Sequence, residues 1–93
     1  MKAKTKKTAP VRIVVLQRGW VVVGRFSQEK EKCRLESASV IRRWGTTKGL
    51  GELAMCGPQP STQLDPTLPI QFHELTAVMH LECEESKWAA HCK

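Results

Sequence analysis

The chain has 93 residues and a mass of 10.5 kDa, which suits one domain rather than two. Apolar residues make up 41% of it, enough for a packed core, and no apolar run approaches the roughly 18 residues of a membrane-spanning helix. These numbers argue against a multidomain enzyme, a membrane protein and a disordered chain. Because a core of this size is small, association into a homo-oligomer would add stability.

Positive charge is concentrated in the first half of the chain. The net charge of +6 divides into +10 for residues 1–48 (13 basic, 3 acidic) and −4 for residues 49–93 (2 basic, 6 acidic). A basic half indicates an anionic partner, namely a nucleotide, a nucleic acid or an acidic protein surface. A disordered basic tail over residues 1–10 that only aids solubility accounts for part of the same charge. The oppositely charged halves also complement each other, which favours self-association.

The first half reads as short strands joined by tight turns. β-Branched and other apolar residues predict strands at residues 11–17, 20–27, 33–36 and 40–44. The first two strands form a hairpin that turns at Arg18 and Gly19. Gly24 inside the second strand predicts a bulge or a sharp bend, because glycine weakens a strand interior. Residues 37–39 are small or polar and predict a break between the third and fourth strands.

A short helix is predicted after the fourth strand. Apolar residues recur at helical spacing from Leu50, and Gly49 fits the N-cap, with Glu52 three residues later as in a partial capping box. Gly57 fits the position after the last turn, and a proline follows it. Two turns are too few for an independently stable helix, so packing must hold it in place.

The second half continues with a loop and a long strand. Residues 58–69 carry four prolines and read as an ordered loop. Apolar and polar residues alternate from residue 70 to 83, which predicts one strand with a core face and a polar face. His80 and Glu82 share the polar face, where solvation explains them better than acid–base catalysis does. Residues 85–93 read as a polar C-terminal tail.

Five or six short strands and one short helix predict a mostly β fold. The expected architecture is a single β-rich domain over residues 11–84, built as a small, strongly bent sheet or a partly open barrel. Its outline is like that of SH3 and Sm barrels, an analogy that concerns the fold alone.

The candidate binding site is the segment that leads from the fourth strand into the helix. It contains Arg42, Arg43, Trp44, Thr46, Thr47, Lys48 and Gly49. Backbone N–H groups at a helix entry favour an anion, and glycines let a ligand approach them, so we expect this entry to be free to accept one. Trp44 can stack on a base while an arginine meets a phosphate. The competing interpretation is that Trp44 covers the core and that the arginines are solvated or paired with acids.

Other residues carry weaker functional signals. Trp20, next to the hairpin tip, is a second candidate binding residue, since exposed aromatic residues often anchor interfaces. The sequence has no Ser/His/Asp pattern, phosphate-binding glycine loop or catalytic carboxylate pair, so we expect no enzymatic activity. Its four cysteines lack C-x-x-C spacing, so we expect no metal, no cofactor and reduced thiols at Cys33, Cys56, Cys83 and Cys92.

Residues 40–57 resemble a pattern in a family of small tailed-bacteriophage proteins. That pattern has an Arg-x-x-Trp type of strand end, followed by a short Leu-x-x-Leu-Ala-x-x-Gly helix. Arg43 and Trp44, which are adjacent in this chain, stand at the strand end, and the helix residues from Leu50 to Gly57 match the helix, within a looser likeness over residues 11–84. This chain departs from the pattern by its Thr-Thr-Lys helix entry, its longer proline-rich loop and its basic tail. The resemblance implies a phage or prophage accessory protein made in the host cytoplasm.

We therefore expect a phage accessory or anti-defence protein that acts by non-enzymatic binding as a homo-oligomer. It would block a host protein or sequester a nucleotide, so its partner is an anionic ligand or an acidic host protein, with no role for a membrane. A nucleic-acid-binding small β-barrel is the alternative, based on the basic half and on Trp44 as a stacking platform. A capsid or tail accessory protein is a further alternative.

Overall fold

The fold is built around one antiparallel sheet, and the computed structural model describes residues 9–92. Its elements, with 3-10 turns marked η, are β1 (Val11–Leu16), η1 (Gln17–Gly19), β2 (Val21–Glu29), β3 (Lys32–Arg43), α2 (Leu50–Cys56), β4 (Gln63–Pro66), β5 (Ile70–His73), η2 (Glu74–Thr76), β6 (Ala77–Glu82) and α3 (Glu85–Trp88). The strand order is β4-β3-β2-β1-β6, and β5 also pairs with β3. Among the described residues, no helix has the length and apolar character needed to cross a membrane.

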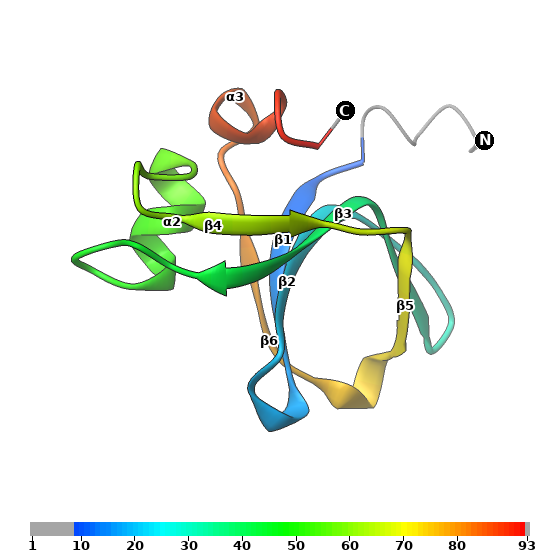
Figure 1. The fold of residues 1–93 in the computed structure, drawn as a ribbon. Helices are drawn as coiled ribbons and strands as arrows, with labels where there is room; N and C mark the ends of the chain where they lie inside the picture. The colour runs from blue at the N-terminus through cyan, green and yellow to red at the C-terminus, as the bar shows by residue number, and fades with distance from the viewer. Residues whose placement is uncertain (1–8, 93) are drawn as a thin grey trace.

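The sheet curls into a partly open barrel, which confirms the expected mostly β fold class (Figure 1). β5 pairs with the first half of β3 and β4 pairs with its second half, so both lie along the same edge of that strand. β6 pairs with β1 at the other end of the sheet. η2 links β5 to β6, but the two strands do not pair with each other, so the barrel stays open between them.

Glycine shapes two turning points of the sheet. The β1–β2 hairpin turns through Arg18 and Gly19, whose φ angles of 70° and 84° are left-handed, and this confirms the predicted hairpin. Gly24 lies against β3, where an added Cβ would be 2.9 Å from the carbonyl oxygen of Glu36. The β2–β3 register shifts at this point, so the predicted bulge at Gly24 is confirmed.

Two segments that were expected to be separate strands form one. β3 continues through residues 37–39, where the sequence predicted a break. Ser37 takes a φ of 51°, and the strand bends there against Gly24 instead of ending. β2 pairs with β3 on both sides of the bend, which keeps the ladder continuous.

The strand expected from residue 70 to 83 is instead two strands separated by η2. The His73 ring accepts the N–H of Leu75 at 3.0 Å, and the Thr76 hydroxyl donates to the His73 carbonyl at 2.7 Å. These local bonds satisfy backbone groups that a continuing strand would pair, so the chain turns. The loop expected over residues 58–69 likewise contains a strand, β4, which pairs with β3.

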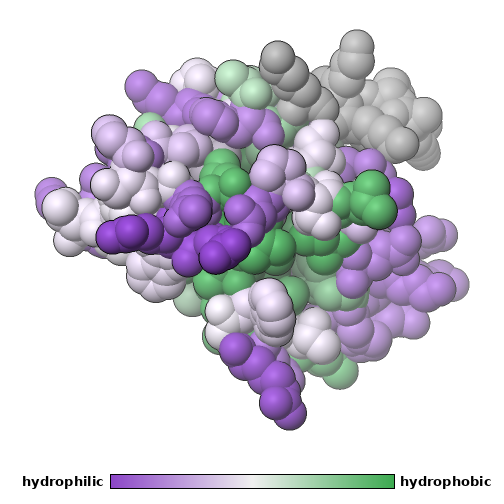
Figure 2. All heavy atoms as spheres, in the orientation of Figure 1, coloured by the Kyte–Doolittle hydropathy of each residue, from purple (hydrophilic) through white to green (hydrophobic). Residues whose placement is uncertain are grey.

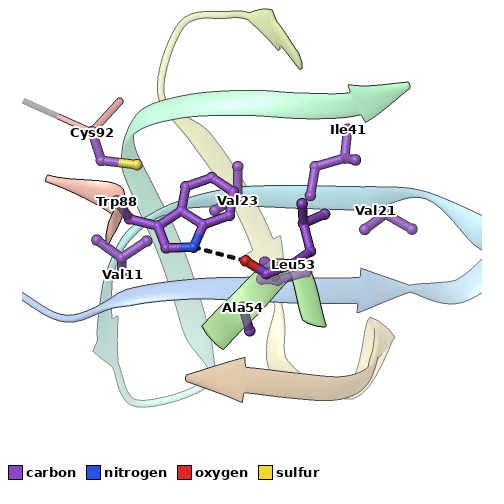
Figure 3. Packing of buried hydrophobic residues seen from close by; sticks show 9 residues of the cluster. Val11, Val21, Val23, Ile41, Leu53, Ala54, Trp88 and Cys92 are labelled. Carbon is purple, nitrogen blue, oxygen red and sulfur yellow. Dashed lines mark hydrogen bonds between the residues drawn. The ribbon is translucent and has the colours of Figure 1, made fainter. Parts of the chain in front are cut away.

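Apolar side chains pack on both faces of the sheet. One cluster lies between the sheet and the two helices and includes Leu53 of α2 and Trp88 of α3 (Figure 3). The other cluster fills the inside of the curl and includes Phe26 and Leu35. β2 contributes alternate residues to the two clusters, which explains why Val21–Phe26 is buried on both faces.

The C-terminal segment belongs to the core, so the expectation of a polar tail from residue 85 was wrong. Trp88 is fully buried, and its indole Nε1 donates to the carbonyl oxygen of Leu53 at 3.1 Å (Figure 3). Cys92 is also buried in the same cluster. Polar neighbours surround these two residues in the sequence, so periodicity gave no sign of a buried element.

A buried arginine holds both ends of the described chain. Arg25 is 5% exposed and donates to the carbonyl oxygens of Ala9 at 2.7 Å and Cys92 at 2.8 Å. Its guanidinium also donates to both carboxylate oxygens of Glu85, at 2.8 and 2.7 Å, and such full pairing is what allows a charge to stay buried. Residues 1–8 of the expected basic tail lie outside the described residues, whereas Ala9 is held in place by this contact.

Candidate functional site

The predicted site begins where β3 ends, at a corner formed by Arg43 and Trp44, which we call the Trp44 corner. Trp44 keeps 42% of its surface exposed, so it is not a buried core residue. Arg43 is also exposed, and it forms no ion pair within residues 9–92. Figure 2 shows hydrophilic side chains, in purple, gathered over this end of β3.

Neighbouring loops fix the backbone of the Trp44 corner. Arg43 pairs with Gln63 of β4, and the Thr62 hydroxyl donates to the Trp44 carbonyl at 2.6 Å. Gly45 takes a φ of 66°, and an added Cβ would be 2.3 Å from the backbone of Ser61. The exposed tryptophan therefore stands on a backbone that neighbouring segments hold in one position.

Arg42 differs from Arg43 in having an acidic partner. Its Nη1 donates to Oδ2 of Asp65 on β4 at 3.1 Å. Both side chains are largely exposed, so the pair contributes little to stability. Of the two arginines, Arg42 therefore has an acidic partner, and Arg43 has none among residues 9–92.

The helix entry does not fulfil the expectation that its N–H groups are free for an external anion. Oε1 of Glu52, in the first turn of α2, accepts the backbone N–H groups of Thr47 at 3.2 Å and Lys48 at 2.8 Å. The Thr47 hydroxyl donates to the same oxygen at 3.2 Å. Thr46 Oγ1 accepts the N–H of Gly49 at 3.0 Å. A carboxylate of the chain itself thus occupies the place that a phosphate would take.

An open groove of about 400 Å³ lies along the exposed side of α2. Lys48 from the predicted segment lines it together with Gly51, Glu52, Met55 and Cys56. Met55 is 67% exposed, so this groove offers apolar surface beside one cation. That composition suits a protein surface better than a polyanion.

Trp20 is exposed, as expected of a binding residue, with 57% of its surface accessible. It follows the β1–β2 turn, and Gln17 in that turn donates to the carbonyl oxygen of Leu75 in η2 at 3.4 Å. Leu75 is 75% exposed, so this end of the barrel carries two exposed apolar side chains, Trp20 and Leu75. Figure 1 shows this end apart from the β3–α2 connection, so the structure does not bring Trp20 into the Trp44 corner.

Sequence reasoning missed a cluster formed by Arg12, Phe26 and His80. The Arg12 guanidinium lies over the Phe26 ring, 4.4 Å from its centre, and the His80 ring meets the same ring edge-on at 5.1 Å. Nη1 of Arg12 is 3.4 Å from Nδ1 of His80. Burial, and secondarily the Arg12 charge, lower the pKa of His80 below its ordinary value. The sequence signal that could have indicated this cluster is Arg12, a charged residue within the otherwise apolar strand β1.

The cysteines are four free thiols in different environments. Cys33 and Cys92 are buried, Cys83 is half-buried and Cys56 is exposed. Burial raises the pKa of Cys83 to about 12 and that of Cys92 to about 11, so both remain protonated near neutral pH. Within residues 9–92, no three His, Cys, Asp or Glu side chains lie close enough together to hold a metal ion.

Comparison with known proteins assigns no family. No protein-family model matches the chain, and no curated protein matches it significantly. The likeness of residues 40–57 to tailed-phage proteins therefore stays a prediction from the sequence.

Proposed function

We propose that this protein is a non-enzymatic binding protein, active as a homo-oligomer, that captures an acidic partner protein through the Trp44 corner. The resemblance of residues 40–57 to tailed-phage proteins suggests the setting, in which the chain is a phage accessory or anti-defence protein and the partner belongs to the bacterial host. In that setting the protein acts in the host cytoplasm.

The observation that carries this proposal is an exposed tryptophan beside an unpaired arginine on a fixed backbone. Trp44 leaves 42% of its surface to solvent, and Arg43 has no acidic partner in the described part of the chain. Tryptophan and arginine are the residue types that contribute most often to binding energy at protein interfaces. A fixed backbone also reduces the entropy lost when such side chains bind.

Occupation of the helix entry favours a protein partner over a nucleotide. A nucleotide phosphate at Thr47 and Lys48 would have to displace the Glu52 carboxylate, which already accepts both backbone N–H groups. Glu52 would also repel it, since like charges at this separation oppose binding. Arg43 and Trp44 stay available for a carboxylate-bearing protein surface.

The test compares two exposed tryptophans. The wild-type protein, Trp44→Ser, Arg43→Ala and the matched control Trp20→Ser are immobilised and exposed to a lysate of candidate host bacteria. We expect at least one protein that is retained by the wild type and by Trp20→Ser and is lost with the other two variants. Equal retention by all four proteins would contradict the proposal.

The nucleic-acid alternative gives a different result in a second measurement. A fluorescent single-stranded oligonucleotide and ATP are titrated with the wild-type protein at increasing salt concentration. We expect no binding that depends on Trp44. Binding of the oligonucleotide that weakens steeply with salt and is lost in Trp44→Ser would favour a nucleic-acid-binding barrel instead.

A further inference from the structure

β6 has a free outer edge. It is the last strand of the sheet, and in the described part of the chain only β1 pairs with it. In an antiparallel pair, the backbone groups of alternate residues point toward the neighbouring strand and away from it. Cys83 donates its N–H to Val11 of β1, so His80 and Glu82 direct their backbone groups outward.

α2 closes only one end of this edge. Glu84, the next outward-facing residue after Glu82, donates its N–H to the carbonyl oxygen of Ala54 in α2 at 2.9 Å. His80 and Glu82 have no such backbone neighbour on the outer side within residues 9–92. A strand with open N–H and C=O groups is a template for pairing with another strand.

A cation lies beside this edge without a carboxylate. Arg12 is held over Phe26 and next to His80, and its Nε is buried with no hydrogen-bond partner among the described residues. Glu82 stands opposite Arg12 in the β1–β6 register, but the two form no ion pair. Arg12 thus lacks an acidic partner within the described chain, although a carboxylate sits on the free edge itself.

We propose that two copies of this protein form a symmetric dimer by antiparallel pairing of their β6 outer edges, with Glu82 of each copy opposite His80 of the other. The proposal deepens the homo-oligomer part of the proposed function and rests on it. In this arrangement each Glu82 reaches the Arg12–His80 pair of the second copy, and this happens twice because the dimer is symmetric.

The charged side chains favour this register over the two neighbouring ones in which the outward-facing backbone groups could also pair. A dimer axis at Glu82 would place two carboxylates opposite each other, and an axis at His80 would place the two Arg12–His80 pairs together. An axis at Leu81 avoids both and sets each Glu82 beside the Arg12–His80 pair of the second copy. It forms four backbone hydrogen bonds, which run between His80 and Glu82 of the two copies. The pairing ends at Met79 and Cys83, because α2 occupies the outer side of Glu84.

The other face of the paired strands would be apolar. Met79, Leu81 and Cys83 alternate with His80 and Glu82 along β6. Leu81 and Cys83 pack against the core cluster that lies between the sheet and the two helices. With the axis at Leu81, the two Leu81 side chains meet and each Met79 lies beside Cys83 of the second copy. Met79 is 48% exposed in the single chain, so pairing removes apolar surface from water.

The first measurement is the mass of the wild-type protein in solution as a function of concentration, by sedimentation equilibrium. We expect a mass that rises to twice the 10.5 kDa of one chain. A single-chain mass up to about 100 μM would overturn the proposed dimer, because its dissociation constant would then exceed that of ordinary functional homodimers.

The second measurement locates the interface without any mutation. Hydrogen exchange of the His80 and Glu82 backbone amides is followed by NMR in dilute and concentrated samples. We expect exchange to slow about tenfold or more when the dimer forms, because these amides become hydrogen-bonded. A dimer in which both amides still exchange rapidly would assign association to another face, overturning this interface while leaving the homo-oligomer proposal intact.

A charge reversal provides the third test. Glu82→Arg should weaken the dimer about tenfold or more, because it brings a second positive charge toward Arg12 of the second copy. Glu29→Arg makes the same charge change in the distant β2–β3 hairpin and should leave the dimer unchanged. Equal weakening by both variants would contradict the proposed contact. Partner capture through Trp44 is measured in a separate experiment. A protein that does not dimerise can therefore be told apart from one that does not bind its partner.

Discussion

Arg25 and Glu85 are 60 residues apart in the sequence and form a two-pronged ion pair, with N–O distances of 2.8 and 2.7 Å. Arg25 is buried, whereas the Glu85 side chain is 57% exposed. The same guanidinium holds the carbonyl oxygens of Ala9 and Cys92. One side chain of β2 therefore fastens α3 and both ends of the described chain to the sheet.

Removal of Arg25 should be among the most destabilising single changes outside the apolar core. Arg25→Ala leaves two buried carbonyl oxygens without donors, so we expect the free energy of unfolding to fall by about 3 kcal/mol. Urea denaturation measures this change. Arg43→Ala, which removes an exposed and unpaired arginine, should change stability by no more than about 0.5 kcal/mol.

The same pair predicts a pH dependence of stability. Hydrogen bonding to Arg25, and secondarily the Arg25 charge, lower the pKa of Glu85 below its ordinary value of 4.5. The stabilisation is therefore complete above the ordinary pKa and is lost as the pH falls through the lowered one. Glu85→Gln should be less stable than the wild type near neutral pH, and the difference should vanish in strong acid. A difference that grows on acidification would contradict this sign.

Three tryptophans should respond differently to truncation. Trp88 is fully buried and hydrogen-bonded to Leu53, so Trp88→Ala should cost about 3 to 5 kcal/mol of stability. Trp44→Ala and Trp20→Ala should each cost less than about 1 kcal/mol, because neither side chain is buried. Thermal denaturation of the three variants provides the comparison. An unfolded Trp44→Ala protein would contradict this prediction and would indicate that Trp44 is part of the core.

Two glycines offer a matched pair of substitutions. Gly24→Ala places a Cβ 2.9 Å from the Glu36 carbonyl oxygen and 3.0 Å from Leu35 Cβ, so we expect destabilisation by about 1 to 3 kcal/mol. Gly51→Ala, within α2, meets no atom within 4 Å and should stabilise the protein by up to about 1 kcal/mol. Calorimetric melting temperatures that move in the same direction for both variants would be inconsistent with these environments.

Local signals predicted those parts of the fold whose geometry depends on neighbouring residues. The β1–β2 hairpin and α2 between Gly49 and Gly57 were predicted because turn glycines and helical spacing act over a few residues. Trp88 was assigned to a tail, since its burial depends on contact with Leu53, 35 residues away. The strand break at η2 was missed because it arises from side-chain bonds at His73.

In the candidate site too, features set by nearby residues were predicted and contacts between distant residues were not. Arginine, tryptophan and glycine composition predicted an exposed corner at Arg43 and Trp44, and the structure shows both side chains exposed. Composition did not show that Glu52 turns back onto Thr47 and Lys48, although its place three residues after Gly49 was the available signal. The Arg12–His80 contact spans 68 residues and follows from β1–β6 pairing alone.

The most direct test of the Trp44 corner as the binding surface is calorimetric titration of a captured partner protein, once purified, against two variants. Trp44→Ser should bind that partner about tenfold or more weakly than the wild type, as expected for an interface tryptophan. Trp20→Ser, which removes a tryptophan that is 57% exposed in another part of the surface, should bind like the wild type. Undiminished affinity of a folded Trp44→Ser protein would contradict the assignment of partner binding to this corner.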